Sequence, residues 1–61
     1  MIKARQRWRT FTGWQFDVIG VRGTHVECEW IEDKTSFCLS LGSFESRIGS
    51  ERFPRYYLES E

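Results

Sequence analysis

Long apolar runs, net charge, proline, cysteine and histidine are all scarce in this chain of 61 residues. It contains one Pro, two Cys and one His, and nine Lys or Arg residues balance nine Asp or Glu residues. No apolar stretch approaches the ~18 residues of a membrane span, and the first residues lead into no signal-peptide core. We therefore expect a cytoplasmic protein without a membrane segment, and the short chain excludes multi-domain enzymes.

Aromatic residues are by contrast abundant, at 16% of the chain, while hydrophobic residues make up 39% and charged residues 30%. This balance is typical of a folded chain. A domain of this size buries only roughly 60% of the surface of its unfolded chain, so its core is marginal. We expect a single small domain over residues 1–61.

Three segments alternate between apolar and polar residues with the two-residue period of half-buried strands. They cover residues 14–20, 24–31 and 35–41. The inner face of the second and third segments is expected to carry Val26, Cys28, Trp30, Phe37, Leu39 and Leu41. Because slipping a strand by one residue would turn its apolar side chains to the wrong face, the alternation constrains the pairing.

Short polar loops between these segments predict two antiparallel hairpins. A three-residue loop at residues 21–23 would place Val18 opposite Val26 and Asp17 opposite Glu27. It would also place Phe16 opposite Cys28 and bring Trp14 to Trp30. A two-residue loop at residues 33–34 would place Trp30 opposite Phe37, Cys28 opposite Leu39 and Val26 opposite Leu41.

A short helix is expected after the third strand, because Leu41, Phe44 and Ile48 recur at spacings of three and four before Gly49. The predicted fold class is therefore α+β, a three-stranded antiparallel sheet followed by a short helix over residues 13–49. Residues 1–12 would form a basic N-terminal arm, and residues 50–61 an aromatic and acidic tail. The alternative fold is a small SH3-like β-barrel, in which the arm and the tail supply two further strands.

The two cysteines are expected to stay reduced. The predicted register turns Cys28 toward the core and Cys38 outward, and one disulfide cannot join opposite faces of a sheet. The single His25 and two scattered cysteines match no zinc-ligand spacing. We expect no disulfide, no metal site and no cofactor.

The zero net charge conceals a basic arm and an acidic face. Every second residue of the arm is basic, so an extended arm would project all four side chains to one side: Lys3, Arg5, Arg7 and Arg9. The outer face of the sheet would carry the acidic residues Asp17, Glu27 and Glu29, which we name the acidic face. Three alternatives would offset the negative charge of the acidic face. They are the basic arm, a cationic protein partner, and a divalent ion held by His25, Asp17 and Glu27.

The basic arm supports a second hypothesis, in which its cations follow a phosphate backbone while Trp8 and Phe11 stack on bases. Arg47 would extend this nucleic-acid site. The competing interpretation is an edge strand that Lys and Arg protect from edge pairing.

Aromatic residues exceed what the predicted core needs. Five are assigned to the core, namely Trp14, Phe16, Trp30, Phe37 and Phe44, and five to the flanks, namely Trp8, Phe11, Phe53, Tyr56 and Tyr57. The flanking residues either cover the sheet or form a protein-binding patch, of which the densest part is Arg52, Arg55, Tyr56 and Tyr57. The chain carries no recognisable nucleophile turn and no phosphate-binding glycine loop, so we do not expect an enzyme.

Several short stretches together suggest a family: Gly13-Trp-Gln-Phe-Asp-Val-Ile, Val26-Glu-Cys-Glu-Trp, Thr35, Leu41-Gly-Ser-Phe and Arg47-Ile-Gly. This pattern, over roughly residues 13–54, resembles the AP2-like DNA-binding units that accompany homing endonucleases, small modules common in phage genomes. The resemblance implies three antiparallel strands, a helix and DNA binding through a basic and aromatic sheet face. The corresponding face of this chain is acidic. The resemblance therefore implies the fold, a phage-like origin and a bacterial host cytoplasm rather than DNA readout.

The leading hypothesis is a non-enzymatic, phage-type interaction protein that binds a host or phage protein stoichiometrically, for instance as an inhibitor of a host enzyme or a defence nucleoprotein. Its predicted protein-binding residues are Asp17, Glu27, Glu29, Arg52, Arg55, Tyr56 and Tyr57. The alternative is a nucleic-acid-binding accessory module that uses Lys3, Arg5, Arg7, Trp8, Arg9 and Arg47. The sequence leaves open whether the protein forms a homo-oligomer.

Overall fold

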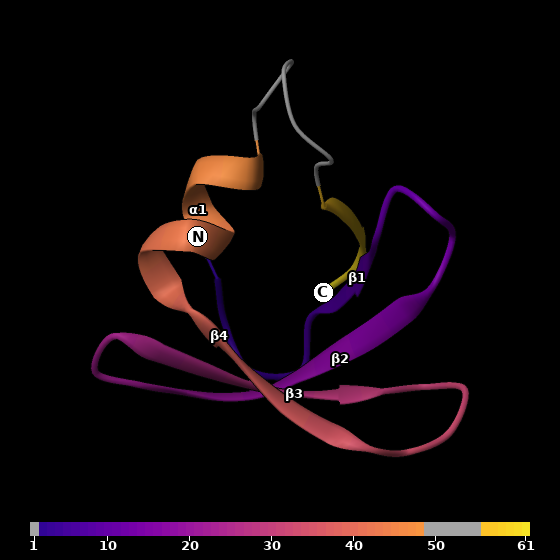
Figure 1. The fold of residues 1–61 in the computed structure, drawn as a ribbon, viewed down its shortest axis with the longest axis horizontal. Coiled ribbons are helices and arrows are strands. Elements are labelled where there is room, and N and C mark those ends of the chain that lie inside the picture. The colour runs from indigo at the N-terminus through magenta and orange to yellow at the C-terminus, as the bar shows by residue number, and fades with distance from the viewer. Residues whose placement is uncertain (1, 49–55) are drawn as a thin grey trace.

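The computed structural model describes residues 2–48 and 56–61 and contains an antiparallel sheet with one helix (Figure 1). The elements are β1 (Arg7–Arg9), β2 (Gln15–Arg22), β3 (His25–Trp30), β4 (Ser36–Ser40), α1 (Leu41–Ile48) and β5 (Tyr57–Ser60). The five strands are ordered β4-β3-β2-β1-β5. The α+β class is confirmed, but the prediction of three strands is wrong, because the arm supplies β1 and the tail supplies β5. No helix in the described residues is long and apolar enough to cross a membrane.

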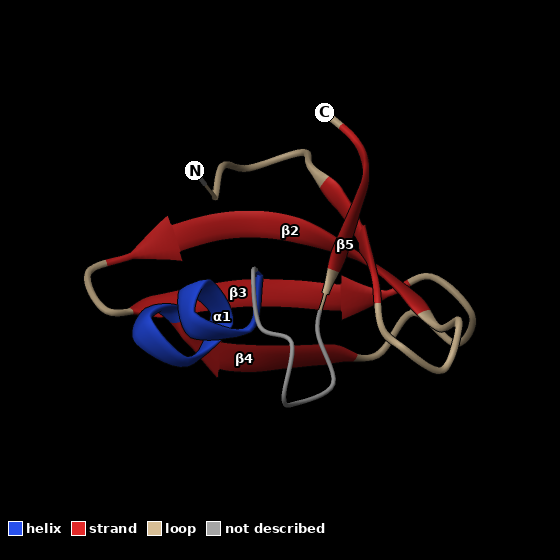
Figure 2. Cartoon of the chain, turned by 90° about the horizontal axis from the view of Figure 1, so that it is seen from above, coloured by secondary structure: helices blue, strands red, loops and turns tan. Residues whose placement is uncertain are grey.

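The sheet is curved, and its concave side faces the helix. Figure 1 shows α1 above this concave side, with β1 and β5 rising on the opposite flank. Seen from above in Figure 2, α1 lies over β3 and β4, whereas β5 crosses over β2. β1 from the arm and β5 from the tail therefore extend the predicted three-stranded sheet on the β2 side. The SH3-like alternative also expects two further strands from the arm and the tail.

The core lies between α1 and the concave side of the sheet. Its buried hydrophobic residues are Ile2, Trp8, Phe16, Val18, Val26, Cys28 and Phe44. Phe44 is the buried residue of α1, and its ring meets Trp8 edge-on with 5.0 Å between centroids. The predicted core positions of Phe16 and Phe44 are confirmed, and Trp30 and Phe37 are partly buried against them.

The predicted locations of Trp8 and Trp14 are both wrong. Trp8, expected in the flanks, is only 4% exposed, whereas Trp14, expected in the core, is 49% exposed. Trp8 is buried because it is the middle residue of a strand whose neighbours Arg7 and Arg9 point to the other face. Trp14 precedes β2 and lies in the turn before it, so the alternation of β2 does not extend to it.

The predicted register between β2 and β3 is wrong. Phe16 faces Trp30 and Val18 faces Cys28, and Asp17 faces Glu29 instead of Glu27. β2 continues to Arg22, which faces His25 across a two-residue turn, and the pairing shifts between Val18 and Gly20. Gly23 has φ +56° in this turn, a backbone conformation that two-residue hairpins favour. The longer strand and the bulge together displace the predicted backbone pairs of Phe16, Asp17 and Val18, whereas the predicted meeting of the Trp14 and Trp30 rings is confirmed.

The predicted register between β3 and β4 is wrong by two residues. Cys28 faces Phe37 and Val26 faces Leu39, because the connecting turn has four residues, 31–34, rather than two. Lys34 adopts φ +64°, and the Asp33 carboxylate accepts hydrogen bonds from the Thr35 N–H at 3.0 Å and hydroxyl at 2.6 Å. Since a shift of two preserves the faces, Cys28 is buried and Cys38 exposed as predicted, and both are free thiols.

The basic arm is not extended throughout. Arg5 has φ +73°, and its N–H donates to the Val18 carbonyl at 2.8 Å. The buried Gln6 side chain accepts hydrogen bonds from the Lys3 N–H at 2.8 Å and the Trp8 indole N–H at 3.2 Å. The turn means that the arm is not extended before β1, although Arg5 and Arg7 still line one pocket together with Asp17.

Candidate functional site

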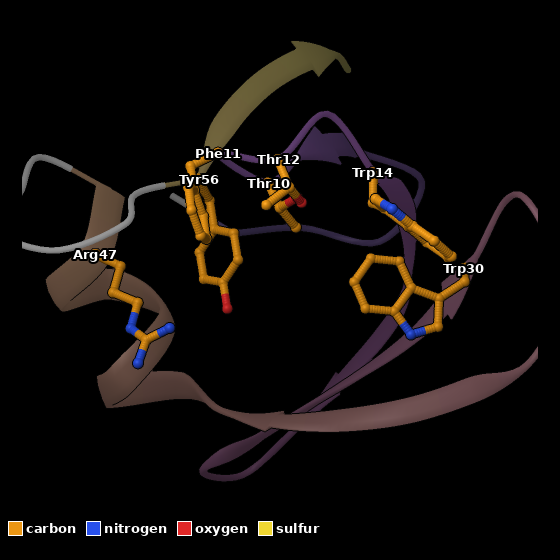
Figure 3. Close-up of a pocket in the computed structure, with 7 residues that line it drawn as sticks. All are labelled: Thr10, Phe11, Thr12, Trp14, Trp30, Arg47 and Tyr56. Atoms are coloured by element: carbon orange, nitrogen blue, oxygen red, sulfur yellow. The ribbon is translucent and has the colours of Figure 1, made fainter.

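An aromatic groove of about 400 Å³ opens at the end of the sheet where the β1–β2 loop lies (Figure 3). Its lining comes from four parts of the chain: the β1–β2 loop, the end of β3, α1 and the residue before β5. The lining residues are Thr10, Phe11, Thr12, Trp14, Trp30, Arg47 and Tyr56. Figure 3 shows Phe11 and Tyr56 on one side of the groove, Trp14 and Trp30 on the other, and Arg47 beside Tyr56.

The β1–β2 loop is tightly hydrogen-bonded and presents two aromatic rings to solvent. The Thr10 N–H donates to the Trp14 carbonyl at 2.8 Å, and the Gly13 N–H donates to the Thr10 carbonyl at 3.0 Å. Gly13 has φ +98°, which an L side chain rarely adopts, so glycine is required there. The loop leaves Phe11 60% exposed and Trp14 49% exposed.

The two walls of the groove are braced by the core. Trp30 meets Trp14 edge-on at 5.7 Å and stacks on Phe37 at 4.5 Å with an interplanar angle of 20°. Tyr56 meets Phe16 at 5.6 Å and Phe44 at 5.0 Å, both edge-on. Because Phe16 and Phe44 are fully buried, these contacts hold the Tyr56 ring in place. The groove is therefore formed before any ligand binds.

Arg47 is the charged side chain among the described residues that line the groove. Arg47 lies in the last turn of α1 and has no ion pair or hydrogen bond with any described side chain. Outside this lining, the Glu32 carboxylate accepts a hydrogen bond at 3.3 Å from the N–H of Gln15, the residue after Trp14. An acidic ligand group is therefore favoured beside Arg47 and disfavoured beside Trp14.

The acidic face is largely matched by the chain's own arginines. Asp17 accepts two hydrogen bonds from Arg7, at 2.8 Å from Nε and 3.2 Å from Nη2, and these raise the pKa of Arg7 above its ordinary value. Arg22 pairs with Glu27 at 3.0 Å. Of the three alternatives for offsetting this charge, the contact with the arm is present at Asp17. Within residues 2–48 and 56–61, no group of three His, Cys, Asp or Glu side chains is placed to hold a metal ion.

The predicted nucleic-acid site is dispersed. Arg7 is paired with Asp17, Arg9 with Glu59, and the Arg9 guanidinium also lies over the Tyr57 ring at 4.6 Å. Trp8 is buried and presents no face for base stacking, whereas Phe11 is 60% exposed. Arg5 lines a pocket with Arg7 and Asp17, while Arg47 and Phe11 line the aromatic groove. Arg52 and Arg55 lie outside the described residues.

Two of the predicted residues meet in the groove although they were assigned to different sites. Tyr56 belonged to the predicted protein-binding patch and Arg47 to the nucleic-acid alternative. Thr10 and Thr12, whose hydroxyls lie 2.8 Å apart, were not predicted at all. The cluster of threonines around Gly13 is a turn signal that would have placed Phe11 and the following tryptophan on a loop.

Comparisons of the chain with protein-family models, with curated proteins and with solved structures find no match. The AP2-like resemblance therefore stays a prediction, and the arrangement of the groove is the basis for a functional proposal.

Proposed function

We propose that this protein is a non-enzymatic binding module whose aromatic groove takes a short extended segment of a partner protein. The observation that carries the proposal is the pair of aromatic walls with Arg47 beside them, which has no ion-pair partner among residues 2–48 and 56–61. Exposed Trp, Tyr and Arg side chains are the residue types that dominate binding energy at protein interfaces. A stoichiometric protein partner, of host or phage origin, thus remains the preferred class. Its proposed site keeps Tyr56 of the predicted protein-binding residues and leaves out the acidic face.

The shape and charge of the groove define the segment. A volume of about 400 Å³ lies within the range of small-ligand sites, so it accommodates a few side chains rather than a folded element. The aromatic walls favour a proline or aliphatic side chain between them, and Arg47 favours a carboxylate next to it. A nucleic-acid strand is the less favoured ligand, because the Glu32 carboxylate, which is hydrogen-bonded to the residue after Trp14, would repel its phosphates.

A selection from random peptides tests the proposal directly. We expect the selected peptides to combine an apolar residue with an acidic residue. Their binding should change the tryptophan fluorescence of the protein, and this change should be smaller in Trp14→Ala. Trp14→Ala should weaken binding about tenfold or more, which corresponds to about 1.4 kcal/mol. Arg47→Glu should shift the selection from acidic toward basic peptides.

The matched control is Ile19→Ala, because Ile19 is 56% exposed and lies outside the groove. Single-stranded oligonucleotides are titrated in parallel at low salt. Peptides that bind Trp14→Ala as tightly as the parent protein would place the site elsewhere. Oligonucleotide binding that is lost with Arg47→Glu, in the absence of peptide binding, would replace the proposed ligand by a nucleic acid.

A further inference from the structure

The edge strand β4 lacks the features that normally prevent edge-to-edge pairing. Its five residues, Ser36–Ser40, read Ser-Phe-Cys-Leu-Ser and include no charge and no proline. Among the described strands it pairs only with β3, so its other edge is open. Natural sheets usually protect such an edge with charges, proline or a bulge. The opposite edge has two of these features, since β5 contains Glu59 and its register with β1 is shifted.

The sequence of β4 is complementary to itself. If two copies pair antiparallel about Cys38, Ser36 of each copy lies opposite Ser40 of the other, and Phe37 lies opposite Leu39. Phe37 and Leu39 are partly buried toward the core, whereas Ser36, Cys38 and Ser40 are exposed on the other face. Apolar residues would thus meet apolar residues and hydroxyls would meet hydroxyls. Such self-complementarity is what a two-fold interface requires.

The backbone of β4 is in the correct phase for this pairing. The Trp30 N–H donates to the Thr35 carbonyl at 2.9 Å, so the backbone of Thr35 faces β3. Because backbone groups alternate between the two edges of a strand, the N–H and C=O groups of Phe37 and Leu39 also face β3. The N–H and C=O groups of Ser36, Cys38 and Ser40 consequently point to the open edge. Figure 2 shows β4 as the outermost strand, with α1 over the face of the sheet.

We propose that β4 pairs antiparallel with β4 of a second copy, centred on Cys38, and forms a two-fold dimer with one continuous sheet. The partner is a second copy because the strand matches its own sequence in this register and carries no charge that would repel it. The inference is independent of the aromatic groove, which lies at the β1–β2 loop rather than along this edge.

Sedimentation velocity under reducing conditions tests the dimer. We expect the sedimentation coefficient of the full chain to rise from that of a monomer to that of a dimer with increasing concentration. Cys38→Lys should remain monomeric, because it sets like charges directly opposite each other at the axis. Ala4→Lys adds the same charge at an exposed residue away from β4, and it should dimerise like the parent protein. Circular dichroism establishes that both variants are folded.

Disulfide cross-linking tests the register. Opposite residues in an antiparallel pair have Cα atoms about 4.5 to 5.5 Å apart, which lies within the span of a disulfide. With Cu(II) as the oxidant, two Cys38 thiols should release two protons, pass one electron to each of two Cu(II) ions, which become Cu(I), and form one Sγ–Sγ bond. Cys28 is buried, and burial raises its pKa to about 12, so it should not react in Cys38→Ser.

The matched variants are Ser36→Cys and Ser40→Cys, each in the Cys38→Ser background. Neither should cross-link with itself, whereas their mixture should form a disulfide, because residues 36 and 40 lie opposite each other in the proposed register. A protein that stays monomeric at all concentrations would overturn the proposal. So would a dimer that Cys38→Lys leaves intact, or cross-linking that does not depend on the position of the cysteine.

Discussion

Replacing Phe44 by alanine is expected to remove most of the stability of the domain. The side chain is fully buried, and its ring lies 5.0 Å from those of Trp8 and Tyr56 and 5.8 Å from that of Phe16. Because it is the buried residue of α1, these contacts attach the helix to the sheet. Truncation of a buried phenylalanine to alanine costs about 3 to 5 kcal/mol.

This loss is large relative to the stability that a chain of this size can have. At roughly 0.05 to 0.15 kcal/mol per residue, a domain of about 60 residues has a free energy of unfolding of about 3 to 9 kcal/mol. We therefore expect Phe44→Ala to be mostly unfolded, or to unfold at a much lower urea concentration. Urea titration followed by tryptophan fluorescence and by circular dichroism measures the difference.

Phe11→Ala is the matched control, because it removes the same ring from a residue that is 60% exposed. Its free energy of unfolding should change by no more than about 0.5 kcal/mol. If Phe44→Ala lost no more stability than Phe11→Ala, Phe44 would not be what docks the helix, and the described core would be wrong at its centre.

Two further predictions concern turns. Gly13→Ala should lower the free energy of unfolding by about 1 kcal/mol or more in urea titrations, because φ is +98° there although a Cβ would contact nothing within 4 Å. Gly20→Ala has the same free space without positive φ, and an equal loss in both would refute the backbone explanation. Asp33 has its pKa lowered, chiefly by the Thr35 hydroxyl and then by the Thr35 N–H. The stabilisation that the ionised Asp33 carboxylate provides is thus present above the ordinary pKa of aspartate and is lost as pH falls through the folded-state pKa. The difference in urea midpoint between the parent protein and Asp33→Ala should therefore narrow below about pH 4. A difference that stays constant down to acid pH would contradict this interpretation.

The alternation of apolar and polar residues predicted the central hairpins and the faces of their strands. Residues 14–20, 24–31 and 35–41 overlap β2, β3 and β4, and the helical spacing of Phe44 anticipated α1. β1 and β5 have only three and four residues, too few to show a period. They exist because the rest of the sheet offers an edge with which they pair.

Both predicted registers are wrong because the lengths of the connecting turns were predicted wrongly. Alternation determines which face a residue occupies, but a shift of two residues leaves every face unchanged. Lys34 and Arg5 adopt positive φ without being glycine, so their residue type gave no turn signal. The bulge between Val18 and Gly20 likewise has no local signature.

The groove was harder to predict because its residues are distant in the sequence. Arg47 and Tyr56 follow the β1–β2 loop by more than 30 residues, and only the pairing of β5 with β1 and the packing of α1 bring them to it. Trp14 was assigned to the core by extending the period of β2 one residue too far. Its exposure depends on the turn at Gly13, which tertiary pairing and positive φ define together.

The charge pattern of the sequence acquires a different meaning in the folded protein. Arg7, Arg9 and Arg22 each pair with a carboxylate of the same chain, so three of the nine basic residues are matched internally. Exposed pairs of this kind contribute only about 0.2 to 1 kcal/mol each, so their main consequence is not stability. They withdraw cations from phosphate binding and carboxylates from a cationic partner. Two surfaces of the described residues do not rely on these pairs: the aromatic groove beside Arg47 and the neutral edge of β4. Binding at both should depend only weakly on ionic strength, and this separates the two proposals from phosphate-driven binding, whose affinity falls steeply with salt.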